Sequence, residues 1–151
     1  MTKEWGNACW DLFHATAVNL NEKETHLIPY ILGMINNVCN NLPCPICSDH
    51  AINTLKRLKR ERIKTKEELI KCIWQFHNLV NERTNKPFYS REKHDSLYKN
   101  KSIDNIVTKW VTIMSRSWGG TTNLMFSFSR RNVVKKVVEF YKKHNKSFMR
   151  Y

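Results

Sequence analysis

Glycine and proline are scarce in this sequence of 151 residues, which contains only four of each. A sandwich of short strands needs many turns, and collagen-like or linker-rich chains need far more of both residues. These classes are therefore excluded, and the scarcity favours helices. The length predicts about one domain, and a hydrophobic content of 41% is enough to form a buried core.

Long apolar segments are also missing. No run approaches the ~18 consecutive apolar residues of a membrane-spanning helix. The first residues, from Met1 to Gly6, lack the basic and then apolar pattern of a signal peptide. We therefore expect a soluble protein of a reducing compartment, without a membrane span.

Acidic residues are few: 13 Asp and Glu stand against 26 Lys and Arg, which gives a net charge of +13. Such a balance favours anionic partners. Nucleic acid, an acidic protein and a phosphate-bearing cofactor all satisfy this condition. Charge alone does not choose among the three.

Apolar side chains recur with helical spacing in six segments. Thr65 and Glu68 form a capping box at the start of one of them, and Pro29 and Pro45 suit the first turns of two others. The spacing predicts an all-α protein with helices at about 4–20, 27–38, 45–58, 65–85, 103–114 and 133–141. Residues 123–129 alternate poorly, and for them we expect a short strand or a loop.

Five cysteines are present, and two of them form the motif Cys44-Pro45-Ile46-Cys47. The motif stands where a loop enters a predicted helix, where unpaired amides and the helix dipole stabilise a thiolate. Two such sulfurs can exchange a disulfide. Two alternatives stay open at this point: a pair of buried, unpaired cysteines, and a zinc site made by Cys39, Cys44, Cys47 and His50.

Polar groups gather on two helical stripes. His77, Asn78 and Asn81 share one helical edge, which suggests hydrogen bonds to a planar polar ligand. Trp10 and His14 lie one turn apart on the first helix and offer a ring face and an imidazole. A core histidine with two exposed asparagines, and simple core packing of the second pair, are the structural alternatives.

The combination of these motifs is more specific than each alone. The segments Trp5-Gly6-x-x-x-Trp10-x-x-x-His14, Leu42-Pro43-Cys44-Pro45-Ile46-Cys47-x-x-His50 and His77-Asn78-Leu79-Val80-Asn81-x-Arg83-x-Asn85-Lys86-Pro87 occur in this order. In order and spacing they resemble the Erv/ALR family of FAD-dependent sulfhydryl oxidases, over about Trp5 to Tyr98. The short form and the Lys- and Asn-rich composition look most like the versions of large cytoplasmic DNA viruses.

The resemblance implies a four-helix bundle plus a short fifth helix, with FAD at its mouth, in a homodimer. It makes Cys47 the flavin-proximal cysteine and Cys44 the cysteine that meets the substrate thiol. The positions that match FAD contacts of the family are Gly6, Trp10, His14, His77, Asn78, Val80, Asn81, Arg83 and Lys86. An oxidase domain would cover residues 1–98, and a helical extension at 99–151 would form an interface.

The implied activity is protein disulfide formation. Electrons pass from a thiol-bearing substrate protein to FAD and then to O2, giving hydrogen peroxide. A thioredoxin-like protein is among the candidate substrates. The implied location is the viral factory in the host cytoplasm, and the virion. No cysteine follows Cys72, so only Cys9 or Cys39 could act as an extra shuttle thiol. Neither a metal nor nucleic acid is expected. The competing classes are a basic, zinc-binding module associated with nucleic acid, and a purely structural helical protein.

Overall fold

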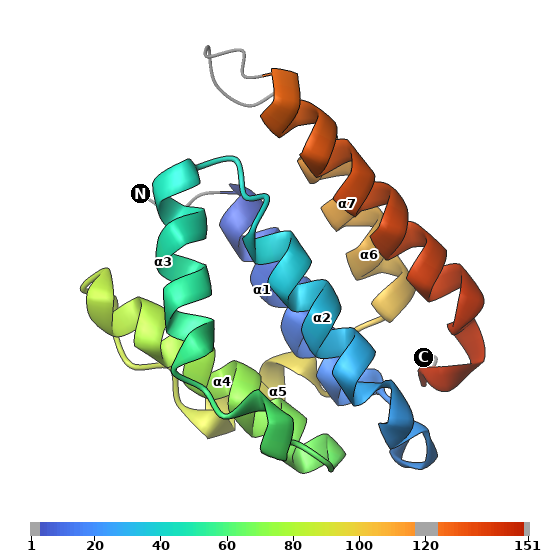
Figure 1. Ribbon diagram of the computed structural model, residues 1–151. Helices are drawn as coiled ribbons and strands as arrows, with labels where there is room; N and C mark the ends of the chain where they lie inside the picture. The colour runs from blue at the N-terminus through green and yellow to red at the C-terminus, as the bar shows by residue number, and fades with distance from the viewer. Residues whose placement is uncertain (1–3, 117–123, 150–151) are drawn as a thin grey trace.

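The computed structural model describes residues 4–116 and 124–149. Seven α-helices occur within these ranges, and Figure 1 shows their arrangement around α1 and α2. The helices are α1 (Glu4–Asn19), α2 (Ile28–Cys39), α3 (Pro45–Lys56), α4 (Lys66–Arg83), α5 (Arg91–Tyr98), α6 (Ile103–Met114) and α7 (Leu124–Lys143). Short 3-10 helices, η1 (Glu22–Leu27), η2 (Arg60–Arg62) and η3 (Asn145–Ser147), complete the described part of the chain. The all-α prediction is confirmed.

Local signals in the sequence start most of these helices. The capping box of α4 is formed, because the Thr65 hydroxyl accepts from the Glu68 amide and the Glu68 carboxylate accepts from the Thr65 amide. Ser90 and Ser102 cap α5 and α6 in the same way with their hydroxyl oxygens. The helices predicted at 4–20, 27–38, 45–58, 65–85 and 103–114 are confirmed to within a few residues at each end.

The C-terminal helix differs from its prediction. Leu124 to Ser129 form the first turns of α7, so the expected strand or loop there is wrong; Asn123 lies outside the described residues. The run of valines that follows has only modest helix propensity because of its β-branched side chains. Packing of an apolar face against neighbouring helices overrides such preferences. Here Val133, Val134 and Val137 are buried in the core.

Helix α1 is the centre of the molecule, because it packs against α4, α5 and α6. Helix α2 packs in turn against α3 and α7. Leu12 and Phe13 of α1 are buried in one continuous hydrophobic cluster together with Ile31, Ile73 and Trp110. Each such side chain contributes roughly 1.5–3 kcal/mol when it is fully buried. The same cluster includes Ala51 and Leu55 of α3, so it holds α1, α3 and α4, which carry most of the candidate site, in one body.

Residues after Tyr98 contribute to the same core. Ile103, Ile106, Trp110 and Met114, the apolar stripe of α6, are buried within this chain, where α6 packs against α1. The end of the chain is attached to the end of α1, since the Met149 amide donates to the Asn19 carbonyl at 2.6 Å. The division into units at 1–98 and 99–151 stays a prediction.

Within the described ranges, no helix combines the length and the apolar character needed to cross a membrane.

Candidate functional site

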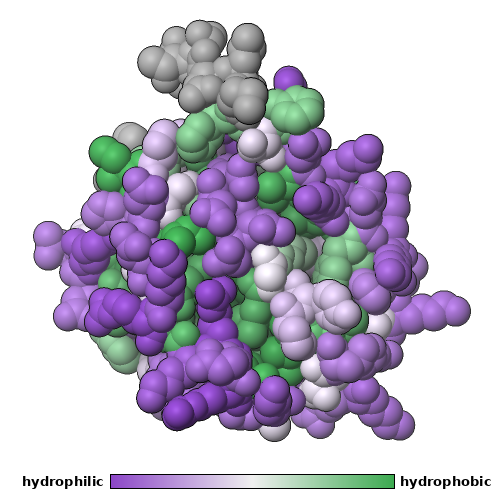
Figure 2. All heavy atoms as spheres, in the orientation of Figure 1, coloured by the Kyte–Doolittle hydropathy of each residue, from purple (hydrophilic) through white to green (hydrophobic). Residues whose placement is uncertain are grey.

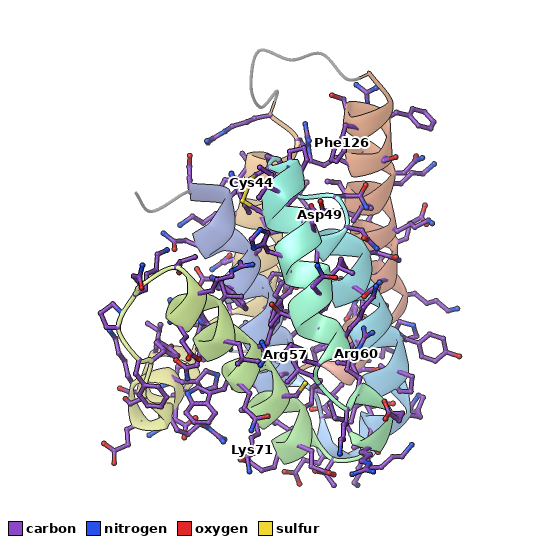
Figure 3. All side chains as sticks on the ribbon, turned by 60° about the vertical axis from the view of Figure 1, so that its left-hand side comes forward. Cys44, Asp49, Arg57, Arg60, Lys71 and Phe126 are labelled. Atoms are coloured by element: carbon purple, nitrogen blue, oxygen red, sulfur yellow. A yellow bond between two sulfur atoms is a disulfide. The ribbon has the colours of Figure 1, made fainter. Side chains whose placement is uncertain are left out.

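A disulfide joins Cys44 and Cys47, with their Cα atoms 5.1 Å apart. Cys44 is the N-cap of α3, and its sulfur accepts a hydrogen bond from the Cys47 amide at 3.2 Å. Pro45 occupies the first turn, where its missing N–H group costs nothing. Figure 3 shows Cys44 at one end of α3 and Arg57 beyond the other end.

The position of the disulfide has a chemical consequence. Amide groups of the first helical turn have no partner within the helix, and they point towards the cap. A thiolate formed there by reduction is stabilised by these amides and by the helix dipole. The prediction of an exchangeable pair is supported, and the alternative of two unpaired cysteines at Cys44 and Cys47 is wrong.

The zinc alternative is not favoured. Two of its four ligands, Cys44 and Cys47, are bonded to each other. Among residues 4–116 and 124–149, no three Cys, His, Asp or Glu side chains come together as a metal site would require. Cys39 is buried at the end of α2, whereas His50 is exposed on α3.

A cavity of about 680 Å³ opens beside the disulfide. Eight of the residues predicted from the sequence line it: Gly6, Trp10, Cys47, His77, Val80, Asn81, Arg83 and Lys86. They come from α1, α3, α4 and the segment after α4. Cys44 is not part of the lining, so the disulfide connects the wall of the cavity to a sulfur outside it.

Three rings are stacked at the cavity. The ring centroids of Trp10 and His77 are 4.0 Å apart and their planes are within 9° of each other. Tyr89 covers the other side of His77 at 5.0 Å. Both faces of the imidazole are therefore occupied by neighbouring rings, and His77 meets a ligand in the cavity through its edge.

His14 lies behind this stack and outside the lining of the cavity. Its side chain is fully buried, and its Nε2 is 2.9 Å from Nδ1 of His77. Burial, with further effects of His77 and His94, lowers the pKa of His14 well below its usual value. Burial, Lys86 and His94 lower the pKa of His77 to about 4. Both imidazoles are therefore neutral at pH 7.

Asn78 faces the segment after α4. Its side chain amide donates to the Tyr89 carbonyl at 2.9 Å, and its oxygen accepts from the Tyr89 amide at 2.8 Å. The Trp74 indole donates to the same carbonyl at 2.7 Å. These bonds hold the backbone that places the Tyr89 ring on His77. Asn78 lines a second hollow of about 630 Å³ and is not among the residues that line the cavity.

The turn after α4 depends on two asparagines. Asn85 has a φ of 57°, the left-handed conformation in which asparagine is favoured over other non-glycine residues at a helix end. Asn81 is buried, and its carbonyl accepts from the Lys86 amide at 2.8 Å. Its side chain amide donates to the Pro87 carbonyl at 3.4 Å. The turn directs Lys86 to the cavity.

The charge around the cavity is positive. Arg83, Lys86 and Lys93 line it, and no carboxylate is found among its described lining residues. Such a site favours the phosphate groups of a ligand over a cation.

Several lining residues were missed by the sequence analysis. Tyr89 and Lys93 lie two and six residues beyond the recognised segment, which ends at Pro87, and Asn7 follows Gly6 directly. Only the aromatic pair after Pro87 was a visible signal. Cys9 and Cys39 also reach the cavity. Burial raises the pKa of the Cys9 thiol to about 12 and that of Cys39 well above its usual value, so both are protonated thiols.

Comparison with known proteins shows which family this chain belongs to. The family model described as the Erv1 / Alr family matches residues 7–99. A protein of Invertebrate iridescent virus 3, whose name assigns it as an FAD-linked sulfhydryl oxidase, is 33% identical over 87 residues, or 56% of this chain. The matched segment spans 59% of that viral protein.

The match to a second relative covers a larger share of that relative's length. The FAD-linked sulfhydryl oxidase of African swine fever virus (isolate Pig/Kenya/KEN-50/1950) is 26% identical over 103 residues, which are 68% of this chain and 86% of the viral protein. The protein of the Tick/Malawi isolate matches equally well. No solved structure matches this chain.

Proposed function

The chain belongs to the Erv1/Alr family, and from that premise we propose that it is an FAD-dependent sulfhydryl oxidase that forms protein disulfides. The observation that carries the proposal is the placement of the disulfide. Cys47 lines the cavity while its partner Cys44 lies outside the lining. One sulfur is thus placed for a cofactor in the cavity and the other for a substrate.

The residues present fit FAD. The cavity has the size of sites that enclose cofactors, and its three basic side chains suit a pyrophosphate. The Tyr89 hydroxyl is buried at the cavity without a hydrogen-bond partner among the described residues, as expected for a group that serves a ligand. Trp10, His77, Arg83 and Lys86 would contact the cofactor; Gly6, Val80 and Asn81 would complete its walls.

The protein's part in the reaction is disulfide exchange. A substrate thiolate attacks Sγ of Cys44, the Cys44–Cys47 bond breaks, and Cys47 leaves as a thiolate stabilised by the start of α3. The second substrate thiolate then attacks the mixed disulfide at the substrate sulfur that is bonded to Cys44. The substrate disulfide forms and Cys44 leaves as a thiolate, so the electron pair from the substrate now resides on the reduced Cys44 and Cys47.

FAD held in this cavity would supply the acceptor for this electron pair, with O2 as the final acceptor and hydrogen peroxide as the product. The chain itself positions Cys47 at the cavity wall and keeps His77 neutral beside it. The three remaining cysteines are free and buried, so they do not compete for the disulfide.

The proposal has two further parts: the substrate is a protein dithiol, and the working form is a homodimer. The relatives are viral proteins, and this supports the host cytoplasm and the virion as the place of action. There disulfides must be formed against the glutathione pool, which requires an oxidase with its own electron acceptor. Sedimentation of the purified protein tests the homodimer, and fractionation of infected cells tests the place of action.

The decisive test is purification of the protein followed by assay with dithiothreitol. We expect a yellow protein with flavin absorbance that consumes O2 and releases hydrogen peroxide in equal amounts. A colourless protein that binds no added FAD would overturn the proposal.

A further inference from the structure

The positive charge of the chain is distributed unevenly along its length. Residues 101–151 contain 11 Lys and Arg against two carboxylates, a net charge of +9, whereas residues 1–100 contain 15 against 11, a net charge of +4. Most of the excess thus lies after the family match, which ends at residue 99. Charge asymmetry of this kind indicates a surface for an anionic partner.

The structure collects this charge on α7 and the turn that follows it. Six basic side chains there are exposed, and Glu139 is the only carboxylate among the described residues of the segment. None of the six forms an ion pair with a described residue. The six are Arg131, Lys135, Lys136, Lys142, Lys143 and Lys146, and we call them the α7 basic face.

The basic face has a regular geometry. Arg131, Lys135 and Lys142 are four and seven residues apart, so they lie on one stripe of the helix. A 20-residue helix is about 30 Å long. The helix lies at the outer edge of the molecule in Figure 1, and Figure 2 shows mainly hydrophilic side chains along that edge.

The other side of α7 is already occupied. Val133, Val134 and Val137 are buried in the core, so the described side chains of the helix leave no apolar face to insert into a bilayer. Phe128 is its only exposed large hydrophobic side chain among the described residues. A protein partner would need apolar anchors at the centre of its interface, and stacking of single-stranded bases would need several aromatic rings.

A duplex phosphate backbone needs only charge. It presents one negative charge per ~1.7 Å of axis, and Lys and Arg recognise it without reading sequence. The major groove of B-form DNA admits an α-helix, whereas that of A-form RNA is too deep and narrow for side chains. We propose that the α7 basic face binds the phosphate backbone of duplex DNA, independently of sequence. The proposal revises the expectation that nucleic acid is not a partner.

The test measures binding of the full chain, loaded with FAD, to a fluorescent 24-base-pair DNA duplex by anisotropy. We expect a Kd of about 1–100 µM at physiological salt, with log affinity falling linearly as log salt rises. The variant Lys135→Gln/Lys136→Gln/Lys142→Gln should bind at least about tenfold more weakly. Its salt slope should be smaller by about 2 to 3, close to one for each phosphate that is no longer neutralised.

A matched control removes equal charge elsewhere. Lys56, Lys59 and Lys64 are exposed and lie near the α3–α4 connection, and Figure 3 shows this end of α3, near Arg57 and Arg60, far from Cys44. Lys56→Gln/Lys59→Gln/Lys64→Gln should weaken binding less than about threefold. Equal losses in the two variants would overturn the proposal, because net charge and not the α7 basic face would then cause binding.

Binding measurements with other anionic ligands distinguish duplex DNA from its competitors. Equal or tighter binding of duplex RNA, of a single strand of the same length, or of vesicles with 30% phosphatidylserine would each overturn the assignment to duplex DNA. So would the absence of duplex binding at physiological salt. Unchanged thermal unfolding of both triple variants shows that their surfaces, and not their folds, were altered. None of these outcomes depends on whether the chain oxidises thiols.

Discussion

Nε2 of His14 and Nδ1 of His77 lie 2.9 Å apart, and this bond is made behind the cavity rather than inside it. Nδ1 of His14 is buried and has no partner among the described residues. An N–H group placed there would be an orphaned donor, which is rarer in proteins than a bare acceptor. The arrangement therefore favours Nε2 of His14 as the donor and Nδ1 of His77 as the acceptor. The proton of the neutral His77 ring is then on Nε2, at the edge that faces a ligand.

The first prediction tests this relationship through His14. His14→Leu removes the donor and should weaken FAD binding by about tenfold, equivalent to about 1.4 kcal/mol, because His77 loses its fixed tautomer. His14→Gln keeps an N–H donor and should remain within about threefold. Titration of the apoprotein with FAD, followed by flavin fluorescence, measures both. Nitrogen-15 shifts of His77 report the tautomer directly, and a proton on Nδ1 in the native protein would contradict the assignment.

A second prediction concerns the disulfide. Cys44→Ser and Cys47→Ser should each abolish oxidation of dithiothreitol, measured as O2 uptake, while FAD stays bound, because the cavity is formed mainly by other side chains. A thiolate-to-flavin absorbance band should persist only in Cys44→Ser, whose remaining thiol lines the cavity. Turnover retained by either variant would show that another thiol does the chemistry.

A third prediction concerns the free cysteines. Burial raises the pKa of Cys9 to about 12 and that of Cys72 to about 11, and it raises that of Cys39 well above its usual value. Since only the thiolate is reactive, these thiols should not react with Ellman's reagent in the native protein at pH 7.5. They should react fully in guanidinium chloride.

The alanine variants of the same three cysteines complete this test. Each should oxidise dithiothreitol within a few fold of the native rate. An effect confined to a protein substrate would identify a shuttle thiol, whereas an equal loss on both substrates would contradict the assignment of Cys44 and Cys47 as the only reactive pair.

A fourth prediction follows from the lowered pKa of His77. The unfolded chain binds a proton near pH 6.5 and the folded chain only near pH 4, so the unfolded state holds more protons between these values. The free energy of unfolding should therefore fall as the pH drops from about 6.5 to about 4, by no more than about 3 kcal/mol from this residue. Urea unfolding at pH 7 and pH 5 measures the change. His77→Phe should reduce it, whereas replacing the exposed His26 by Gln should not.

The last prediction concerns the packing of α6 on α1. Trp110 is fully buried, and its indole donates to the Cys9 sulfur at 3.3 Å. Trp110→Ala should lower the free energy of unfolding by about 3–5 kcal/mol, because it leaves a large cavity against α1. Thr112→Ala, on the exposed side of α6, should change it by less than about 0.5 kcal/mol. Similar small effects in both variants would show that packing of α6 on α1 does not stabilise the fold.

Much of the fold could be predicted because its signals are local. The capping box at Thr65, the prolines in the first turns of α2 and α3, and the apolar spacing act over a few residues. The cysteine motif is equally local, because its chemistry depends on a helix start encoded next to it. The sequence by itself therefore determined α1, α2, α3, α4 and α6 and the paired cysteines Cys44 and Cys47, whereas apolar spacing did not predict α5.

Only the tertiary structure decided which polar residues face the cavity. Helical spacing suggested Asn78 and Asn81 as ligand contacts, and the family resemblance added His14. Asn81 does line the cavity, yet His14 is covered by His77 and Asn78 is bound to the backbone of Tyr89. The valines of α7 likewise depend on neighbours, since their local helix propensity is weak and the burial of Val133, Val134 and Val137 supplies the stability. Such outcomes are set by contacts between residues far apart in the chain, and periodicity within one segment carries no information about them.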